Sequence, residues 1–316
     1  MRLRPIAALS AAVSVLLLAG CAGSGDSAGP SPSATAAADL CSAQVSSGDA
    51  SDAVTVTGDA GAVPEATFSS PVDVPELQVT VVSPGEGDAI AAGDFINYAM
   101  VAYDAQTGEK LGELGYQPAE LAPLQISPDS PLAQILGCGA PGERVVAAFP
   151  ASEQGNAQIY VVDLVGKVPT AAWGEPQEPV DGMPTVTLGD NGAPTITIPE
   201  TDPPTETQLA TLKQGDGYTV QPGDSVLVQY TGVRWSNGKT FDSTWDKGGV
   251  PTSFSTTGVV KGFGQALEGH TVGSQVLVVI TPADGYGEGE INDADLKGDT
   301  LVFVVDILGA QHTATQ

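Results

Sequence analysis

The stretch Val228-Gln-Tyr-Thr-Gly232 is followed, after four residues, by Asn237-Gly-Lys-Thr-Phe-Asp-Ser243. Both runs are rich in β-branched and aromatic residues, which favour strands. The Asn-Gly pair at the start of the second run is the strongest short-range signal for a hairpin turn. The stretch therefore predicts two antiparallel strands joined by a tight turn.

Four further motifs follow this hairpin in order. They are V-V-K-G-F (259–263), G-x-x-V-G (269–273), T-P-A-D-G-Y-G (281–287) and D-T-L-V-F-V-V-D-I-L (299–308). Over about a hundred residues the series resembles that of the FKBP-type peptidyl-prolyl cis-trans isomerases. The resemblance implies an α+β domain over 205–311, in which a bent antiparallel sheet, a half-barrel, wraps around a short helix at about Gly262 to Leu267.

The same resemblance implies an active site in the apolar hollow between sheet and helix. The residues that it assigns to the walls and floor are Tyr230, Phe241, Asp242, Val259, Val260, Phe263, Tyr286 and Phe303. The N–H of Val260 and the hydroxyl of Tyr286 would position the bound chain, while the Asp242 carboxylate would fix the rim. Such a pocket removes water from an Xaa-Pro bond and fits the twisted imide better than either planar isomer, so no cofactor or metal is needed. Core packing for the aromatic residues and turn capping for Asp242 are the alternatives.

Three positions depart from the family pattern. Phe263 stands where a tryptophan floor is usual, Lys247 where an arginine is usual, and Thr252 where a wall phenylalanine is expected. A shallower pocket should lower the catalytic rate and weaken the binding of macrolides.

The chain also repeats itself. Gly93–Tyr98 matches Gly223–Val228 at an offset of 130 residues, and further glycine and apolar matches follow in the same order. We therefore expect a second, degenerate FKBP-like domain over 40–170, although two unrelated β domains with similar turns would also fit. At the positions of Tyr230, Phe241 and Asp242 this copy has Met100, Leu111 and Gly112, so its role is expected to be that of a scaffold or protein-binding module.

Between the two copies, residues 171–204 form a proline-rich connector with possible edge strands, and residues 312–316 form a tail. Asp293, Asp295 and Asp299 lie in an acidic loop that lacks the glycine and terminal glutamate of a helix-loop-helix calcium site, so a solvated loop is expected. Gly262-Phe-Gly264 lacks the third glycine of a dinucleotide fingerprint. His270 has no catalytic serine or cysteine motif as a partner and is interpreted as a turn residue.

The N-terminus has the features of a targeting segment. Arg2 and Arg4 precede an apolar run that ends at Leu18-Ala-Gly-Cys21, which resembles a bacterial lipobox. Residues 1–20 are therefore expected to be a lipoprotein signal peptide, Cys21 the lipidation site, and residues 21–39 a flexible tether. An ordinary signal peptide with a chance cysteine is the alternative. Cys41 and Cys138 would then pair as a disulfide in an oxidising compartment, or remain two buried thiols.

The charge of the chain limits its partners. A formal net charge of −27, with 38 acidic against 11 basic residues, leaves no cluster that could neutralise a phosphate backbone, so nucleic acid is an unsuitable partner. The sequence predicts an extracytoplasmic isomerase, lipid-anchored to a bacterial membrane, that acts on proline-containing secreted polypeptides, with chaperone activity and a tacrolimus- or rapamycin-type macrolide as further expectations. A non-catalytic, membrane-tethered binding module with degenerate folds is the alternative.

Overall fold

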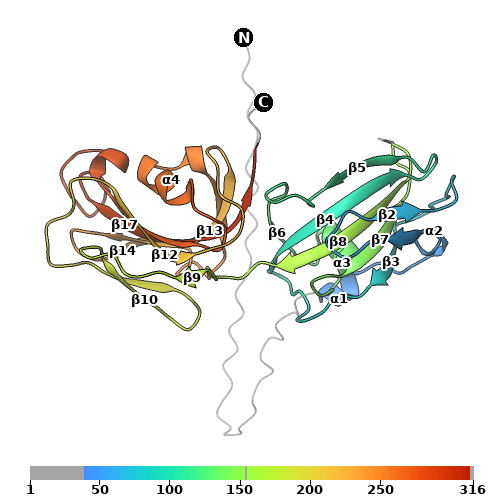
Figure 1. Ribbon diagram of the computed structural model, residues 1–316, viewed down its shortest axis with the longest axis horizontal. Coiled ribbons are helices and arrows are strands. Elements are labelled where there is room, and N and C mark those ends of the chain that lie inside the picture. Colours follow the sequence, from blue (N-terminus) through green and yellow to red (C-terminus); the bar gives the residue numbers. More distant parts are fainter. Residues whose placement is uncertain (1–38, 154, 314–316) are drawn as a thin grey trace, which may run out of the picture. The chain divides into compact units, whose positions relative to one another are not determined.

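The computed structural model describes residues 39–153 and 155–313, and it is built mainly from two antiparallel sheets (Figure 1). The predicted sheet-rich fold with short helices is confirmed for these residues. Cys21 and the predicted signal peptide lie outside them. Within the described ranges, no helix has the length and apolar character needed to cross a bilayer.

The first sheet has six strands in the order β3-β7-β8-β4-β5, with β6 paired to β4. Its strands are β3 (Gln78–Ser83), β4 (Phe95–Asp104), β5 (Lys110–Leu114), β6 (Leu124–Gln125), β7 (Arg144–Phe149) and β8 (Gln158–Lys167). Around it lie α1 (Leu40–Ala43), α2 (Asp49–Asp52), α3 (Pro131–Leu136) and a hairpin of β1 (Thr55–Thr57) and β2 (Glu65–Thr67). Helix α3 begins where Ser130 accepts a hydrogen bond from the Ala133 N–H at 3.2 Å, and a proline at its first position suits a helix start.

The second sheet has seven strands in the order β14-β13-β17-β16-β12-β9, with β15 paired to β13. Its strands are β9 (Glu175–Pro176), β12 (Gln208–Gln214), β13 (Ser225–Arg234), β14 (Thr240–Ser243), β15 (Thr252–Ser255), β16 (Gln275–Ile280) and β17 (Leu301–Gln311). The other elements of this part are a hairpin of β10 (Thr185–Leu188) and β11 (Pro194–Thr197), helix α4 (Lys261–Leu267) and the 3-10 turns η1 (Thr256–Gly258) and η2 (Pro282–Asp284).

The two sheets share their strand order and their irregularities. The β3/β7 ladder shifts register between Val81 and Ser83, and the β12/β16 ladder shifts at the positions 130 residues later. The β4/β5 ladder shifts after Ala102, and the β13/β14 ladder shifts after Gly232. Because a bulge fixes which side chains face the core on either side of it, equal bulges give the two sheets equivalent inward positions.

The segment expected to be a connector contains the β10–β11 hairpin as well as the edge strand β9. The hairpin pairs Thr185 with Thr197, and the β1–β2 hairpin pairs Thr55 with Thr67 in the same way. Apolar residues of both hairpins join the clusters on the sheet faces that point away from α3 and α4. Each hairpin therefore closes one face of its own sheet.

The main core of each sheet lies between the sheet and its helix. Leu136 of α3 packs in the first core and Leu267 of α4 in the second, and neither is accessible to solvent. Burying a leucine of this kind contributes about 1.5–3 kcal/mol. Gly262 lets α4 pack closely against β16, because a Cβ at this position would lie 2.5 Å from Cγ2 of Ile280.

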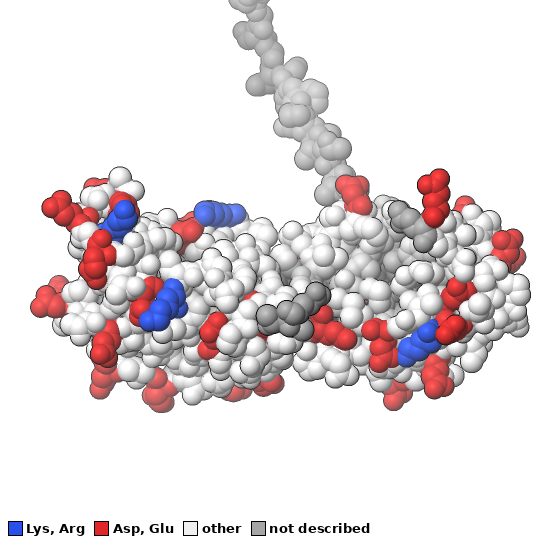
Figure 2. Space-filling view, turned by 90° about the horizontal axis from the view of Figure 1, so that it is seen from above, with Lys and Arg blue, Asp and Glu red and all other residues white. Residues whose placement is uncertain are grey.

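Charged groups are mainly acidic and exposed, and red carboxylates outnumber blue cations on the face in Figure 2. Several charged residues are buried nonetheless, among them an ion pair in the first part of the chain. Arg144 and Asp163 form a buried ion pair with a Nε–Oδ1 distance of 2.5 Å.

Cys41 in α1 is joined by a disulfide bond to Cys138, which lies just after α3.

Candidate active site

One cavity of about 360 Å³ opens between the second sheet and the N-terminal end of α4. It is lined by all eight residues that the sequence singles out: Tyr230, Phe241, Asp242, Val259, Val260, Phe263, Tyr286 and Phe303. Phe254 and Gly258 complete the lining. Strands β13, β14, β15 and β17 supply the walls, and α4 with the segment before it closes the remaining side.

Aromatic rings form the floor and walls as a connected cluster. Phe263 lies edge-on to Phe303 at 5.1 Å between ring centroids and to Tyr230 at 5.8 Å. Phe241 meets Phe303 edge-on at 5.4 Å. Edge-to-face pairs at these distances add about 0.5–1.5 kcal/mol each to the burial of the rings. The cavity therefore has a rigid, apolar interior.

Gly232 lets two of these rings come together. A Cβ at this position would lie 2.6 Å from Cε1 of Phe303 and 2.8 Å from Cζ of Phe241. No side chain can be accommodated at these distances without moving a ring. The glycine that ends the quoted Tyr-Thr-Gly run is thus required by packing.

Asp242 holds the polar edge of the cavity. Its Oδ2 accepts a hydrogen bond of 2.7 Å from the Tyr230 hydroxyl, and its Oδ1 lies 2.5 Å from Nζ of Lys247. Burial alone would raise the pKa of Asp242, but the hydrogen bonds from Lys247 and Tyr230 outweigh it and lower that pKa below its ordinary value. Burial, followed by the hydrogen bond to Asp242, raises the pKa of Tyr230. The pair is therefore an ionised carboxylate and a neutral phenol at neutral pH.

Two groups at the mouth can donate hydrogen bonds to a ligand. Val260 is the residue that caps α4, and its N–H makes no hydrogen bond to another described residue. The first N–H groups of a helix have no partner within the helix, so this donor is free to bind a carbonyl. Tyr286 also lines the cavity, and this residue is about half exposed, at 49%.

The same segment of the chain matches a known family. Residues 217–308 match FKBP-type peptidyl-prolyl cis-trans isomerases. The probable FK506-binding protein of Corynebacterium glutamicum is 34% identical over 107 residues, which cover 34% of this chain and 89% of the relative. The chain belongs to the FKBP-type isomerase family.

Two further proteins are similar to parts of this chain. The FK506-binding protein of Streptomyces anulatus is 32% identical over 108 residues, which span 33% of this chain and 86% of the relative. The crystal structure of the three FKBP domains of wheat FKBP73 is 18% identical, with a TM-score of 0.30, and covers 74% of this chain and 94% of that chain.

The wall that the FKBP pattern assigns to Thr252 differs from expectation. A phenylalanine two residues later, Phe254, lines the cavity, and its ring lies 5.9 Å from that of Tyr230 and 5.8 Å from that of Phe263. Alternate residues of β15 face the same side, so the strand presents both positions toward the core. The wall therefore has an aromatic ring even though Thr252 carries none. The alternation of inward and outward residues along β15 is the sequence signal that could have identified Phe254.

The first sheet has its own cavity, of about 490 Å³, at the equivalent place. Met100, Leu132, Ile135, Phe149 and Tyr160 are among its lining residues. The register pairs Met100 with Val162 and Ala102 with Tyr160, as Tyr230 pairs with Val305 and Gly232 with Phe303. Neither a carboxylate nor an exposed tyrosine is part of this lining as described. The hollow is present, but the polar rim of the second cavity is missing.

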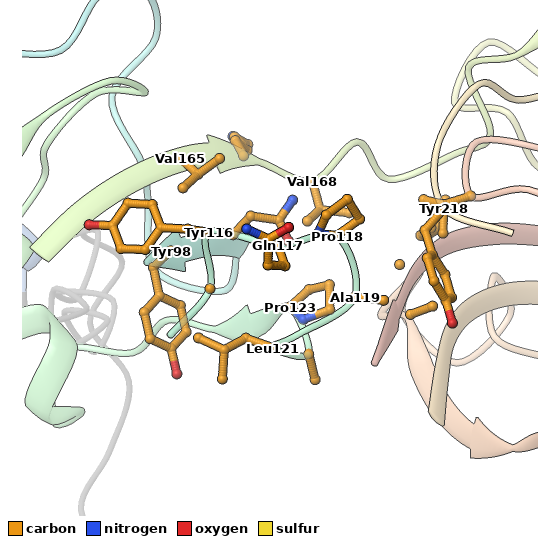
Figure 3. Close-up of a pocket in the computed structure, with 18 of the residues that line it drawn as sticks. Tyr98, Tyr116, Gln117, Pro118, Ala119, Leu121, Pro123, Val165, Val168 and Tyr218 are labelled. Atoms are coloured by element: carbon orange, nitrogen blue, oxygen red, sulfur yellow. The ribbon is translucent and has the colours of Figure 1, made fainter. Parts of the chain in front are cut away.

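A further cleft, of about 420 Å³, has Tyr98, Tyr116, Leu121 and Pro123 among its lining residues (Figure 3). The Tyr116 hydroxyl donates to Asp163 at 3.2 Å, so this ring is tied to the buried ion pair of the first sheet. None of the eight predicted pocket residues lines this cleft. Within residues 39–153 and 155–313, no cluster of three or more His, Cys, Asp or Glu side chains could hold a metal ion.

Proposed function

We propose that the chain catalyses cis–trans isomerisation of Xaa-Pro bonds in the cavity between the second sheet and α4. The observation that carries the proposal is the convergence of an aromatic box with two ligand donors, all at positions that match the family. A proline ring is small enough for a cavity of about 360 Å³, and the flanking peptide can lie along the mouth. No nucleophile is required, because the reaction is a rotation about one bond.

The cavity supports a mechanism of desolvation and twisting. Amide resonance gives peptide bonds a rotation barrier of about 18–20 kcal/mol, and water bound to the carbonyl favours the planar, charge-separated form. The rings of Tyr230, Phe263 and Phe303 exclude that water from around the imide. The Val260 N–H and the Tyr286 hydroxyl hold the chain on either side, so that binding energy is used to favour the twisted state. Each 1.4 kcal/mol of such preference accelerates rotation about tenfold.

In this proposal Asp242 orients the wall of the pocket. Its carboxylate fixes the Tyr230 hydroxyl at 2.7 Å and is itself held by Lys247, so the ring at the rim has one orientation. Lysine in place of the usual arginine still provides a cation for this purpose, but it cannot form a two-pronged contact.

The shared strand order supports a second proposal, that residues 40–170 and 205–311 are two FKBP-like domains, each with a bent sheet around its helix. The second copy would be the enzyme. The first, which has Met100, Leu111 and Gly112 in place of the three pocket residues, would be a scaffold or a protein-binding domain that gives the protein chaperone activity. Proline-containing secreted polypeptides are the proposed substrates, and tacrolimus- or rapamycin-type macrolides are proposed inhibitors.

We also propose that Cys21 carries a lipid anchor and that the protein acts outside the bacterial cell membrane. The lipobox-like sequence and the pairing of Cys41 with Cys138 support this location, since disulfides persist in oxidising compartments. Incorporation of a labelled fatty acid by wild type but not by Cys21→Ser would support the anchor, and equal incorporation by both would refute it.

A protease-coupled assay with an Xaa-Pro peptide tests the enzymatic proposal. Wild type should accelerate isomerisation, and Asp242→Leu and Tyr286→Phe should each lower kcat/KM by on the order of tenfold, because each removes a group that orients the pocket or the bound chain. Tyr160→Phe is the matched control, since it removes a tyrosine hydroxyl from the equivalent cavity of the first sheet. If the folded wild type gives no acceleration over background, the proposal is wrong.

A further inference from the structure

Beside the proposed active site lies an arginine that no family motif includes. Arg234 is the last residue of β13, four residues after Tyr230 in the same strand, and its side chain is only 10% exposed. Its guanidinium points into the acidic loop 288–299. A buried arginine needs partners for its donors, and this loop supplies them.

The partners are mainly backbone carbonyl groups. Nη1 donates to the carbonyl oxygens of Asn292 at 2.8 Å and Asp295 at 3.1 Å, and Nη2 donates to that of Asp293 at 3.4 Å. Three carbonyls of one short loop therefore converge on a single cation. The guanidinium occupies the position around which the loop is folded.

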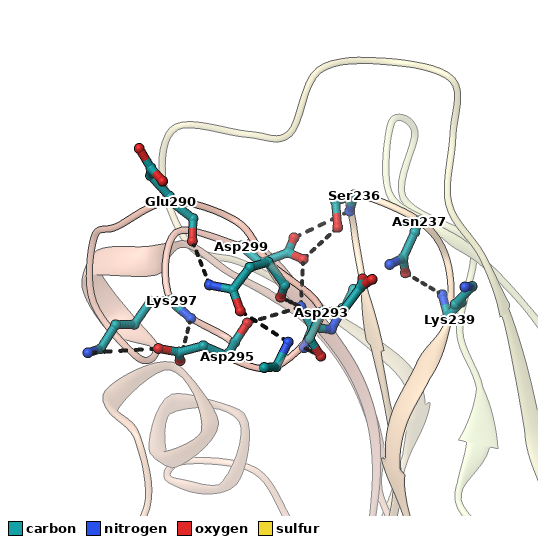
Figure 4. A network of polar contacts seen from close by, with 11 residues as sticks. Ser236, Asn237, Lys239, Glu290, Asp293, Asp295, Lys297 and Asp299 are labelled. Atoms are coloured by element: carbon teal, nitrogen blue, oxygen red, sulfur yellow. Dashed lines mark hydrogen bonds and ion pairs between the residues drawn. The ribbon is translucent and has the colours of Figure 1, made fainter.

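The far end of the loop is tied to the same place. Asp299 is almost completely buried, lies 3.7 Å from Nη1 of Arg234, and accepts hydrogen bonds of 2.5 and 3.3 Å from the hydroxyl and N–H of Ser236 (Figure 4). The loop carries four other carboxylates, at 288, 290, 293 and 295, which repel one another when they are brought together. Lys297 pairs with one of them, Asp295, at 3.8 Å, and the buried guanidinium binds the backbone of the loop and lies beside Asp299.

The loop in turn contacts the segment that holds Tyr286. The Gly298 N–H donates to the carbonyl of Gly287 at 2.9 Å, directly after Tyr286 in the chain. Gly298 also approaches Gly289 so closely that a Cβ would lie 2.2 Å from its carbonyl oxygen. Leu296 packs against the apolar cluster that contains the pocket rings. The position of the loop therefore fixes the backbone on which the rim tyrosine is mounted.

We propose that Arg234 is a positioning residue for the isomerase site: it folds the loop 288–299 around its guanidinium and thereby holds Tyr286 at the rim of the proline pocket. This inference rests on the proposed function, and it adds a residue that acts through another without touching the substrate. The equivalent position of the first sheet is Asp104, which binds the N–H groups of Gln106 and Thr107 and the side chain of Asn156. The arginine is thus specific to the copy that has the complete pocket.

The variants that test this role are Arg234→Met, Arg234→Lys and Lys239→Met. Lys239 lines the same cleft as Arg234 but is exposed, so Lys239→Met removes an equal charge without removing a carbonyl contact. Arg234→Met should accelerate amide hydrogen exchange across 288–299 and lower kcat/KM by on the order of tenfold. Arg234→Lys should lie between wild type and Arg234→Met, because an ammonium group can reach some of the carbonyls but lacks the planar fork. Lys239→Met should match wild type.

A double-mutant cycle with Tyr286→Phe separates positioning from a general structural role. If Arg234 acts through Tyr286, Arg234→Met combined with Tyr286→Phe should lose little more kcat/KM than Tyr286→Phe alone. The proposal would be overturned if the loss of kcat/KM in the double variant equalled the product of the two single losses. It would also be overturned if Arg234→Met kept the wild-type kcat/KM while hydrogen exchange in the loop became faster. If Arg234→Met does not fold, Arg234→Lys provides the same cycle. Absence of isomerase activity in wild type would refute the proposed function. Unchanged amide hydrogen exchange across 288–299 in Arg234→Met would refute only the claim that Arg234 anchors the loop.

Discussion

The two sheets of this protein have the same strand order and bulges but differ in what they place at equivalent positions. In the second sheet, Tyr230 and Asp242 form the polar rim of an aromatic cavity. In the first, Met100 and Gly112 stand at these positions, and no carboxylate is among the residues described as lining its cavity. The comparison indicates that the turns, the bulges and the helix–sheet core specify the fold. Under the proposed function, a few inward positions then decide whether the hollow can act on a prolyl bond.

The interiors differ in a second way. Arg144 pairs with Asp163 in the β7/β8 register, and Gln275 pairs with Asp306 at the same place in β16/β17. The first pair is a buried salt bridge, while in the second the Gln275 amide donates to Asp306 at 2.7 Å. Burial raises the pKa of Asp306, which has no guanidinium against it. The first sheet thus depends on an ion pair where the second uses a hydrogen bond.

Replacing one partner in each sheet should give the largest difference between them. Arg144→Leu leaves the Asp163 carboxylate buried without its counterion and should lower the free energy of unfolding by about 3–5 kcal/mol. Gln275→Leu removes one hydrogen bond and should cost about 1–3 kcal/mol. Urea unfolding followed by circular dichroism measures both values. Equal losses would show that the ion pair has no special role in the first sheet.

The next effect concerns the glycine beneath the aromatic box. Gly232→Ala forces a methyl group against the rings of Phe303 and Phe241 and should cost about 1–3 kcal/mol of stability, with a loss of isomerase activity. The equivalent residue in the first sheet is already an alanine, and Ala102→Gly should cost about 0.5–1 kcal/mol and leave activity unchanged. Thermal unfolding and the coupled assay on the same samples provide the comparison. Wild-type activity in Gly232→Ala would contradict the proposed packing of the pocket.

The smallest effect on stability, a dependence on pH, is expected from Glu143. The equivalent residue in the second sheet is Ser274. Their carbonyls accept matching hydrogen bonds from Leu164 and Ile307. The Ser274 hydroxyl also accepts a hydrogen bond from the Gly215 N–H at 2.9 Å and shares one with the Thr271 hydroxyl at 3.0 Å. Oε1 of Glu143 is buried without a partner among the described residues, and burial raises the pKa of Glu143 to about 6.

Between about pH 4.5 and pH 6 the folded chain retains a proton on Glu143 that the unfolded chain has lost. The free energy of unfolding should therefore fall by about 1–2 kcal/mol as the pH rises through this window. Glu143→Gln should remove this fall, as chemical unfolding across pH 4 to 7 would show. The same pH dependence in both proteins would rule out Glu143 as its source.

Much of the second sheet could be predicted from the sequence because its motifs are local. The Asn-Gly turn, the strand alternation and the ordered aromatic residues placed Tyr230, Phe263 and Phe303 together, and the structure brings them into one cavity. Phe254 is not among the predicted site residues, because the family pattern assigns this wall to Thr252, although both lie on the same face of β15. The hairpin β10–β11 was placed in a connector, although Gly-Asp-x-Gly turns follow both β1 and β10 in the sequence.

The remaining features depend on contacts that no local pattern encodes. Arg234 stands in an ordinary strand position, and its partners are backbone carbonyls of a loop about sixty residues away. The orientation of such carbonyls follows from the folded loop, so residue types and spacing alone cannot predict it. The acidic loop is largely exposed as expected, but the prediction is wrong for Asp299, which is buried against Ser236 and Arg234. The central arginine of the loop could not be recognised from the sequence.

Exchange NMR spectroscopy on an Ala-Pro peptide, with catalytic amounts of the full chain, tests the central claim most directly. We predict exchange cross-peaks between the cis and trans forms in the presence of wild type, strongly reduced cross-peaks with Asp242→Leu, and undiminished ones with Tyr160→Phe. Cross-peaks that survive in Asp242→Leu but disappear in Tyr160→Phe would assign the activity to the first sheet and contradict the account.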